Sequence, residues 1–302
     1  MKFSKFFKPA MLISLVIILL AVVLTVCGRG MNLGLDFAGG LSMPYDLGET
    51  ASQPDVAAVL GNDYNVTIQG ESKNEALVRI KSVGAEDVQD VQAAVTAKLQ
   101  TAYPKAIPQG DVSYVGPVAG ATLIRNAITS VAIAAVLMLI YIAVRFDFHS
   151  GLAAVLALLH DVAVMLAFMV ILRDLIELNS SFIAAALTIV GYSINDTIVI
   201  FDRIRENAKN KPELLKGEIV DLSVTESLGR TIMTSITTLV TILALYILGV
   251  PAIKEFALPI IVGVLAGTYS SNLISGYIWA WMEEKFPKKE KTADDEDEDD
   301  EE

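Results

Sequence analysis

The sequence predicts an α-helical membrane protein with six transmembrane helices and one extracytoplasmic α+β domain between the first and the second helix. Hydrophobic residues make up 53% of the chain, and its mean hydropathy of +0.53 is too high for an ordinary soluble protein. Six apolar segments are each long enough to cross a bilayer, which takes roughly 20 helical residues. One long polar segment separates the first two. The predicted spans are residues 10–27, 122–144, 152–172, 179–201, 229–250 and 256–282.

The first element is a cytoplasmic amino end with the first span, together residues 1–27. Lysines precede this span, and Lys and Arg recur in every second loop, so the positive-inside rule makes both chain ends cytoplasmic. The short outer loops carry only Arg173 and Lys254. The basic residues on the predicted cytoplasmic side are Lys2, Lys5, Lys8, Arg145, Arg203, Arg205, Lys209, Lys211, Lys216, Lys285, Lys288, Lys289 and Lys291.

Residues 28–117 form the predicted extracytoplasmic domain, in the β-α-β-β-α-β order of a ferredoxin-like unit. Pro44 in the first strand favours an edge position, because proline cannot donate to a neighbouring strand. The glycine-rich "GLDFAGG" (Gly34–Gly40) is expected to be a tight turn between the first span and the sheet, since it lacks the strand-turn-helix context of a nucleotide site. No catalytic set, cofactor or metal site is predicted here. Strands are predicted at 41–48, 64–71, 75–83 and 110–118, and helices at 52–60 and 86–100.

Residues 118–282 form a predicted bundle of five helices with a cytoplasmic connector, 202–228, that is expected to contain an amphipathic helix against the membrane face. In the last span small residues recur every four positions, which places them on one helix face and allows close packing, within this chain or against a partner subunit. These small residues are Gly263, Gly267, Ser271 and Ser275.

Residues 283–302 form a predicted cytoplasmic tail. It ends in nine consecutive acidic residues (294–302), which we expect to be disordered and solvated. Because this run dominates the net charge of −12, the charge does not point to a binding partner, and no nucleic-acid partner is expected.

Polar residues inside the predicted bundle are the candidate functional groups. "YSINDTIVIFDRIREN" (192–207) carries Asn195 and Asp196 within an apolar run, where an ionised carboxylate costs several kcal/mol unless it is compensated. Arg230 enters the next span from the same side and could balance that charge. His160 and Asp161 lie midway along the third span. A static ion pair that fixes helix register and a carboxylate that takes up and releases protons are equally compatible with these residues.

Several long motifs, in order along nearly the whole chain, resemble the SecF branch of the SecD/SecF family of bacterial protein-export subunits, which is related to the resistance-nodulation-division exporters. They are "GLDFAGG", "GPVAGATLIRNA", "RFDFHSGLAAVLALLHD", "YSINDTIVIFDRIREN", "SLGRTIMTSITTL" and "FALPIIVGVLAGTYSS".

The resemblance implies an accessory subunit, not an enzyme, that pairs with SecD beside the SecYEG channel in the bacterial cell membrane. Such a subunit uses the proton-motive force to promote export of polypeptides, with protons as the coupling ion. By motif match the membrane aspartate of the family falls on Asp196 and its arginine on Arg230, with Asn195, His160 and Asp161 as further relay candidates. The alternatives are a scaffold that stabilises the translocon without transduction, a small-molecule exporter, for which the chain is short, and an intramembrane hydrolase, for which no activated nucleophile is present.

Overall fold

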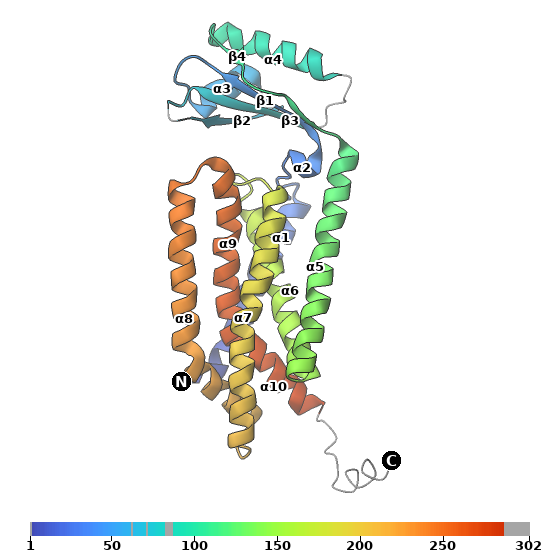
Figure 1. The fold of residues 1–302 in the computed structure, drawn as a ribbon, viewed down its shortest axis with the longest axis vertical. Coiled ribbons are helices and arrows are strands. Elements are labelled where there is room, and N and C mark those ends of the chain that lie inside the picture. The colour runs from blue at the N-terminus through green and yellow to red at the C-terminus, as the bar shows by residue number, and fades with distance from the viewer. Residues whose placement is uncertain (1, 62, 71, 82–86, 287–302) are drawn as a thin grey trace.

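The structure is a computed structural model that describes residues 2–61, 63–70, 72–81 and 87–286 (Figure 1). The predicted acidic run lies outside these residues. So do Glu71, Ser82, Val83 and Glu86, at the ends of three predicted elements of the outer domain.

Six helices in the described part of the chain are long and apolar enough to cross a membrane, one at each predicted span. The chain is therefore a multi-pass membrane protein. The two helices between which the predicted connector lies, α7 and α8, extend well beyond the predicted spans. The helices are α1 (Ser4–Val26), α5 (Pro117–Arg145), α6 (Phe148–Ile171), α7 (Ser180–Asn210) and α8 (Lys216–Leu248), followed by α9 (Pro251–Ser270) and α10 (Gly276–Lys285), which a π-helical turn (Ser271–Ser275) joins into one span.

The bundle has central and peripheral helices. In the most apolar 18-residue stretch of each span, half of the residues of α6 and of α7 are buried, and 61% of those in the α9–α10 span, against 6% in α5 and 11% in α8. The apolar clusters of the bundle are built around α6, α7 and α9, with contributions from α8 and α10. The buried polar side chains of these helices, among them Asp161 on α6, Asp196 on α7 and Ser270 on α9, therefore lie away from water and lipid headgroups.

The outer domain is an antiparallel sheet with two helices (Figure 1). Its strand order is β2-β3-β1-β4, with β5 also beside β1, so the strand pair β1 and β2 is split by β3. Strands and helices follow the predicted β-α-β-β-α-β order with one additional strand: β5 lies within the last predicted strand (110–118), and the two-residue β4 lies before it. Membership of the ferredoxin-like class stays a prediction. The elements are α2 (Leu35–Ala38), β1 (Gly40–Asp46), α3 (Gln53–Leu60), β2 (Tyr64–Gln69), β3 (Glu75–Lys81), α4 (Val88–Ala102), β4 (Ile107–Pro108) and β5 (Ser113–Val115).

Alternation along the strands divides the sheet into two faces. Leu41, Met43 and Tyr45 on β1 are fully buried and belong to an apolar core with α3 and α4. Their neighbours on β1 point to the opposite face, which Figure 1 shows turned toward the membrane helices. The domain thus has a core of its own, separate from the clusters of the bundle.

The predicted edge position of Pro44 is wrong, because β1 is a central strand that pairs with β3 on one side and with β4 and β5 on the other. Pro44 lies opposite Leu77 of β3. On the other side it falls between the residues that pair with β4 and those that pair with β5. The missing N–H of proline therefore falls at the gap in the neighbouring strand, where no ladder bond is lost.

The predicted connecting helix within 202–228 is also not a separate element. Instead α7 runs on to Asn210 and α8 begins at Lys216. Polar contacts hold these two extensions together: Arg203 Nε donates to Glu226 over 2.7 Å, and Asn207 Nδ2 donates to Ser223 over 3.0 Å. Ile204, Ile219 and Val224 of this segment are buried in an apolar cluster of the bundle, whereas Leu215 is 70% exposed.

Candidate functional site

Asp196 lies on α7 in the middle of the bundle and is only 3% exposed. Its Oδ2 has no hydrogen-bond partner among the described residues, and neither has the hydroxyl of Tyr192, one turn earlier on α7. On α8, which packs against α7, the buried hydroxyl of Thr231 is also without a partner. Buried polar atoms are almost always hydrogen-bonded, so three exceptions on two neighbouring helices mark an unusual place in the fold.

The structure does not bring Asp196 and Arg230 into the predicted ion pair. No carboxylate oxygen of the described residues lies within 4.0 Å of the Arg230 guanidinium, and Arg230 is exposed. The reason is the rotation of α8, which turns Ser227, Thr231 and Ser235 inward at intervals of four residues and leaves Arg230 on the outer side. Asn195 on α7 is exposed as well. Asp196 is thus buried, whereas Asn195 and Arg230 are exposed on the surface of this chain.

Asp161 on α6 occupies a saturated site. It is fully buried, and its Oδ2 accepts hydrogen bonds from Ser193 of α7 over 2.5 Å and from Ser270 of α9 over 2.9 Å. Its Oδ1 lies 2.9 Å from Nδ1 of His160. One carboxylate therefore joins the three central helices of the bundle.

His160 extends this network to the first span. Its Nε2 lies 2.7 Å from Oγ of Ser14 on α1 and 3.1 Å from the hydroxyl of Tyr269 on α9, and these two hydroxyls are 2.6 Å apart. Ser14 also donates to the carbonyl oxygen of Ala10 over 3.0 Å. The polar network thus reaches from α7 to α1, and each of its members has a partner.

Sequence reasoning selected His160 and Asp161 and missed the four hydroxyls that bind them. Ser and Tyr are common in membrane helices, and the spacing within one helix does not reveal which helices are neighbours. The residues missed are Ser14, Ser193, Tyr269 and Ser270.

Two members of the small-residue stripe lie against α7. A Cβ at Gly263 would lie 2.4 Å from Cγ1 of Ile189, and a Cβ at Gly267 would lie 3.1 Å from Cβ of Ser193. Ser271 and Ser275 are fully buried, but they delimit the π-helical turn, so the spacing of the stripe is not regular beyond Ser270. The close approach at Gly267 is what lets Ser193 and Ser270 reach the same carboxylate oxygen.

The "GLDFAGG" segment lies where the outer domain meets the bundle, and it contains the short helix α2 in place of a simple turn. Asp36 of α2 accepts from the backbone N–H of Ser180, at the start of α7, over 2.9 Å. Gly40 has a φ of +138°, and a Cβ there would lie 2.2 Å from the carbonyl oxygen of Ile80 on β3. Only glycine fits this position, since both the backbone conformation and the space exclude a side chain.

Among the described ranges, no three His, Cys, Asp or Glu side chains are close enough to hold a metal ion.

These features define a class: a six-span membrane protein with a small outer domain and buried carboxylates in its central helices. The family described as "Protein export membrane protein SecD/SecF, C-terminal" matches residues 94–285, and the "SecD/SecF GG Motif" family matches residues 26–43. The chain therefore belongs to the SecD/SecF family of protein export membrane proteins, as the resemblance of its motifs indicated.

Relatives of known name agree. The protein translocase subunit SecF of Rickettsia felis is 38% identical over 262 residues, which cover 85% of this chain and 84% of that protein. The SecF of Gemmatimonas aurantiaca is 38% identical over 280 residues, which cover 87% and 81%.

Two solved structures of SecDF are similar to this fold. The crystal structure of SecDF from Thermus thermophilus, a translocon-associated membrane protein, matches with a TM-score of 0.76 and 35% identity over 92% of this chain. A structure of SecDF in a super-membrane-facing form matches with a TM-score of 0.66 and 34% identity. This chain spans only 38% and 39% of those two chains.

Proposed function

We propose that this chain is an accessory subunit of the bacterial Sec translocase that works with SecD to promote export of polypeptides through SecYEG, driven by the proton-motive force. It lies in the bacterial cell membrane with both ends in the cytoplasm and the α+β domain on the outer side. It does not catalyse a reaction of its own. Protons are its coupling ion.

The observation that supports this proposal is the isolated carboxyl of Asp196. A buried oxygen without a donor costs about 1–3 kcal/mol, and a bound proton lowers the cost by neutralising the group. Ionisable groups inside membrane bundles commonly mark proton pathways. A buried carboxyl whose Oδ2 accepts no hydrogen bond from the described residues is suited to bind and release a proton as the bundle changes its packing.

Asn195 and Arg230 are included in the same proposed proton pathway because of the surface on which they lie. Both are exposed on this chain, on helices that pack against each other. A charged or amide side chain facing lipid at this depth is unfavourable. We infer that SecD covers this surface and supplies the other half of the pathway, with Arg230 close enough to Asp196 to favour its ionised form when the helices move.

The proposal is tested with Asp196→Asn in proteoliposomes that contain SecYEG, SecD and this chain. We expect export to lose its stimulation by an imposed proton gradient, while membrane insertion and SecD binding stay intact. The matched control is Asp202→Asn, the same change on the same helix at an exposed position 3.8 Å from Arg145. Undiminished stimulation in the Asp196→Asn protein would reject the relay.

The competing function is a scaffold that stabilises the translocon without transducing energy. The saturated network around Asp161, which ties four helices together, is the feature that favours it. A scaffold tolerates the double substitution Asp196→Asn with Arg230→Met, because asparagine keeps the volume of the buried aspartate, no hydrogen bond among the described residues depends on the Asp196 Oδ2, and Arg230 is exposed. A proton-driven subunit does not tolerate it.

A further inference from the structure

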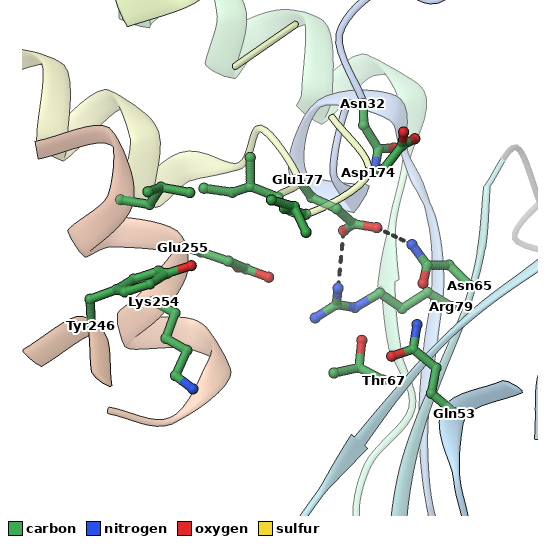
Figure 2. A pocket seen from close by; sticks show the side chains of 13 residues that line it. Asn32, Gln53, Asn65, Thr67, Arg79, Asp174, Glu177, Tyr246, Lys254 and Glu255 are labelled. Carbon is green, nitrogen blue, oxygen red and sulfur yellow. Dashed lines mark hydrogen bonds and ion pairs between the residues drawn. The ribbon is translucent and has the colours of Figure 1, made fainter. Parts of the chain in front are cut away.

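The contact between the outer domain and the bundle is polar and incompletely filled. The core of the outer domain and the cores of the bundle are separate clusters. Between the sheet and the outer ends of the helices lies a cavity of about 350 Å³, lined by polar and charged side chains from both sides (Figure 2). Interfaces of this kind, without a shared apolar core, are the ones across which domains move relative to each other.

A partly buried ion pair crosses this interface. Arg79 lies on β3, on the face of the sheet toward the bundle, and its Nη1 is 3.0 Å from Oε2 of Glu177, in the loop between α6 and α7. The side chains are only 19% and 10% exposed. Asn65, opposite Arg79 on β2, donates to the other oxygen of Glu177 (Figure 2). The Glu177 carboxylate thus accepts hydrogen bonds from side chains on two adjacent strands of the outer sheet, β2 and β3.

The loop that carries Glu177 is also fixed to the start of α7. Leu178 exchanges backbone hydrogen bonds with the segment before α2: its N–H donates to Asn32 over 2.7 Å, and its carbonyl accepts from Gly34 over 2.8 Å. Asn179 caps α7, accepting from Ser181 over 3.0 Å. Only two residues lie between Glu177 and Ser180, the first residue of the helix that carries Asp196. A displacement of α7 therefore acts directly on Glu177.

The chain enters the outer domain at α2 and leaves it at α5, and these two helices contact each other more closely than the sheet contacts the bundle at Arg79. Figure 1 shows α2 and the start of α5 together below one end of the sheet. A Cβ at Gly120 of α5 would lie 2.4 Å from the carbonyl oxygen of Phe37 in α2, so the two backbones touch. This close contact resists movement more than the polar contact at Arg79 does, because it has no room to rearrange.

From these contacts we infer that the Arg79–Glu177 pair is the joint that passes movement of α7 to the outer sheet, while the α2–α5 contact acts as the pivot. The inference rests on the proposed function, since it is protonation of Asp196 that would move α7. A guanidinium and a carboxylate in a partly buried site form a directional link that a shift of one partner pulls on. Arg79 and Glu177 are accordingly positioning residues for export, in contact with neither the proton site nor the membrane interior.

The test compares this pair with a second ion pair at the same level of the molecule. Arg29 and Asp174 are 2.5 Å apart, with Asp174 in the same α6–α7 loop, but their side chains are 60% and 71% exposed. The variants are Glu177→Gln, the charge exchange Arg79→Glu with Glu177→Arg, and the control Asp174→Asn. Movement is measured by spin-label distances between Ala97 on α4 and Ala252 on α9, both exposed, in a chain whose only cysteine is changed, Cys27→Ser.

We expect an imposed proton gradient to change the label distance in the parent and Asp174→Asn proteins, and to leave it unchanged in Glu177→Gln. Proton flux in vesicles that also contain SecD should persist in Glu177→Gln, whereas gradient-stimulated export is lost. The charge exchange should restore both the distance change and export. A parental distance change in Glu177→Gln overturns the joint, as does a charge-exchanged protein that inserts and binds SecD but recovers neither property. Proton flux that is independent of Asp196 would instead overturn the proposed function, so the two failures are distinguishable.

Discussion

Asp161 and Asp196 are two buried aspartates on neighbouring central helices, and their surroundings are opposite. Asp161 on α6 is fully buried, and its Oδ2 alone accepts two hydroxyl hydrogen bonds, from two other helices. Asp196 on α7 is 3% exposed, and its Oδ2 accepts none from the described residues. Among the described residues, the Asp161 carboxylate therefore has hydrogen-bond donors, and the Asp196 Oδ2 has none.

The difference separates two uses of a carboxylate inside a membrane. A carboxylate held by several donors is fixed in one charge state and one position, because moving it leaves each donor unsatisfied. A carboxyl that accepts no hydrogen bond from the protein is not fixed in one charge state or one position. It can therefore exchange a proton without breaking hydrogen bonds to the protein. We assign Asp161 and His160 to anchoring the helices, and Asp196 to the proton step of the proposed function.

The contrast occurs within one helix. Ser193, which donates to Asp161, precedes Asp196 by less than one turn of α7. The middle of α7 is thus tied to α6 and α9 next to the residue proposed to change its charge. Movement of α7 on protonation is then expected at its ends rather than at Ser193, which agrees with a joint at Glu177.

The largest expected effect is on stability, from Asp161→Ala. The substitution leaves the hydroxyls of Ser193 and Ser270 and the ring of His160 without their common acceptor, and breaking a buried charged network of this kind costs about 3–5 kcal/mol. We expect a clear fall in the melting temperature of the purified chain in detergent, measured by the loss of monomer on heating.

The control is Asp196→Ala in the same assay. No hydrogen bond depends on the Asp196 Oδ2 in the described structure, so we expect its melting temperature to stay close to that of the parent. If Asp196→Ala were as destabilising as Asp161→Ala, the distinction between an anchoring and a proton-exchanging carboxylate would be lost.

A smaller effect is expected where α9 packs against α7. Gly263→Ala places a methyl group 2.4 Å from the Ile189 side chain, which is fully buried and cannot turn away. Overpacking of this type costs about 1–3 kcal/mol. Gly191→Ala is the matched control, because a Cβ there has no atom within 4 Å. Equal melting temperatures for the two variants would show that the α7–α9 contact does not hold the Asp161 network in place.

The helices and their order could be predicted from the sequence because span length and hydrophobicity depend only on local residues. The outer elements followed from alternation and helical spacing, with the error at Pro44, whose meaning depends on a gap in a strand more than 60 residues away in the sequence. The connector was misjudged because mixed charge is expected both of a surface helix and of two long helices that extend beyond the membrane and pair with each other.

The candidate residues were identified by type, but their relations could not be. Charge in an apolar run singled out Asp161, Asp196 and Arg230. Whether two such residues meet depends on the rotation of each helix about its axis, and a rotation of one residue, about 100°, turns a side chain from the interior to the surface. That rotation places Thr231 inside and Arg230 outside. The hydroxyl partners of Asp161 come from two other helices, α7 and α9, so no spacing within α6 indicates them.

The finest test of the contrast is Ser193→Ala, which removes one of the two hydroxyls on Oδ2 of Asp161. Because Ser270 still donates to the same oxygen, we expect a loss of about 1–2 kcal/mol, less than for Asp161→Ala. Thr188→Ala on the same helix is the control, since that exposed hydroxyl donates only to the carbonyl of Ala184. Both variants should retain gradient-stimulated export, because an anchor weakened by one bond still holds α7. A Ser193→Ala protein with parental stability and no stimulation would place the Asp161 network on the proton pathway itself, and the two aspartates would then share one function.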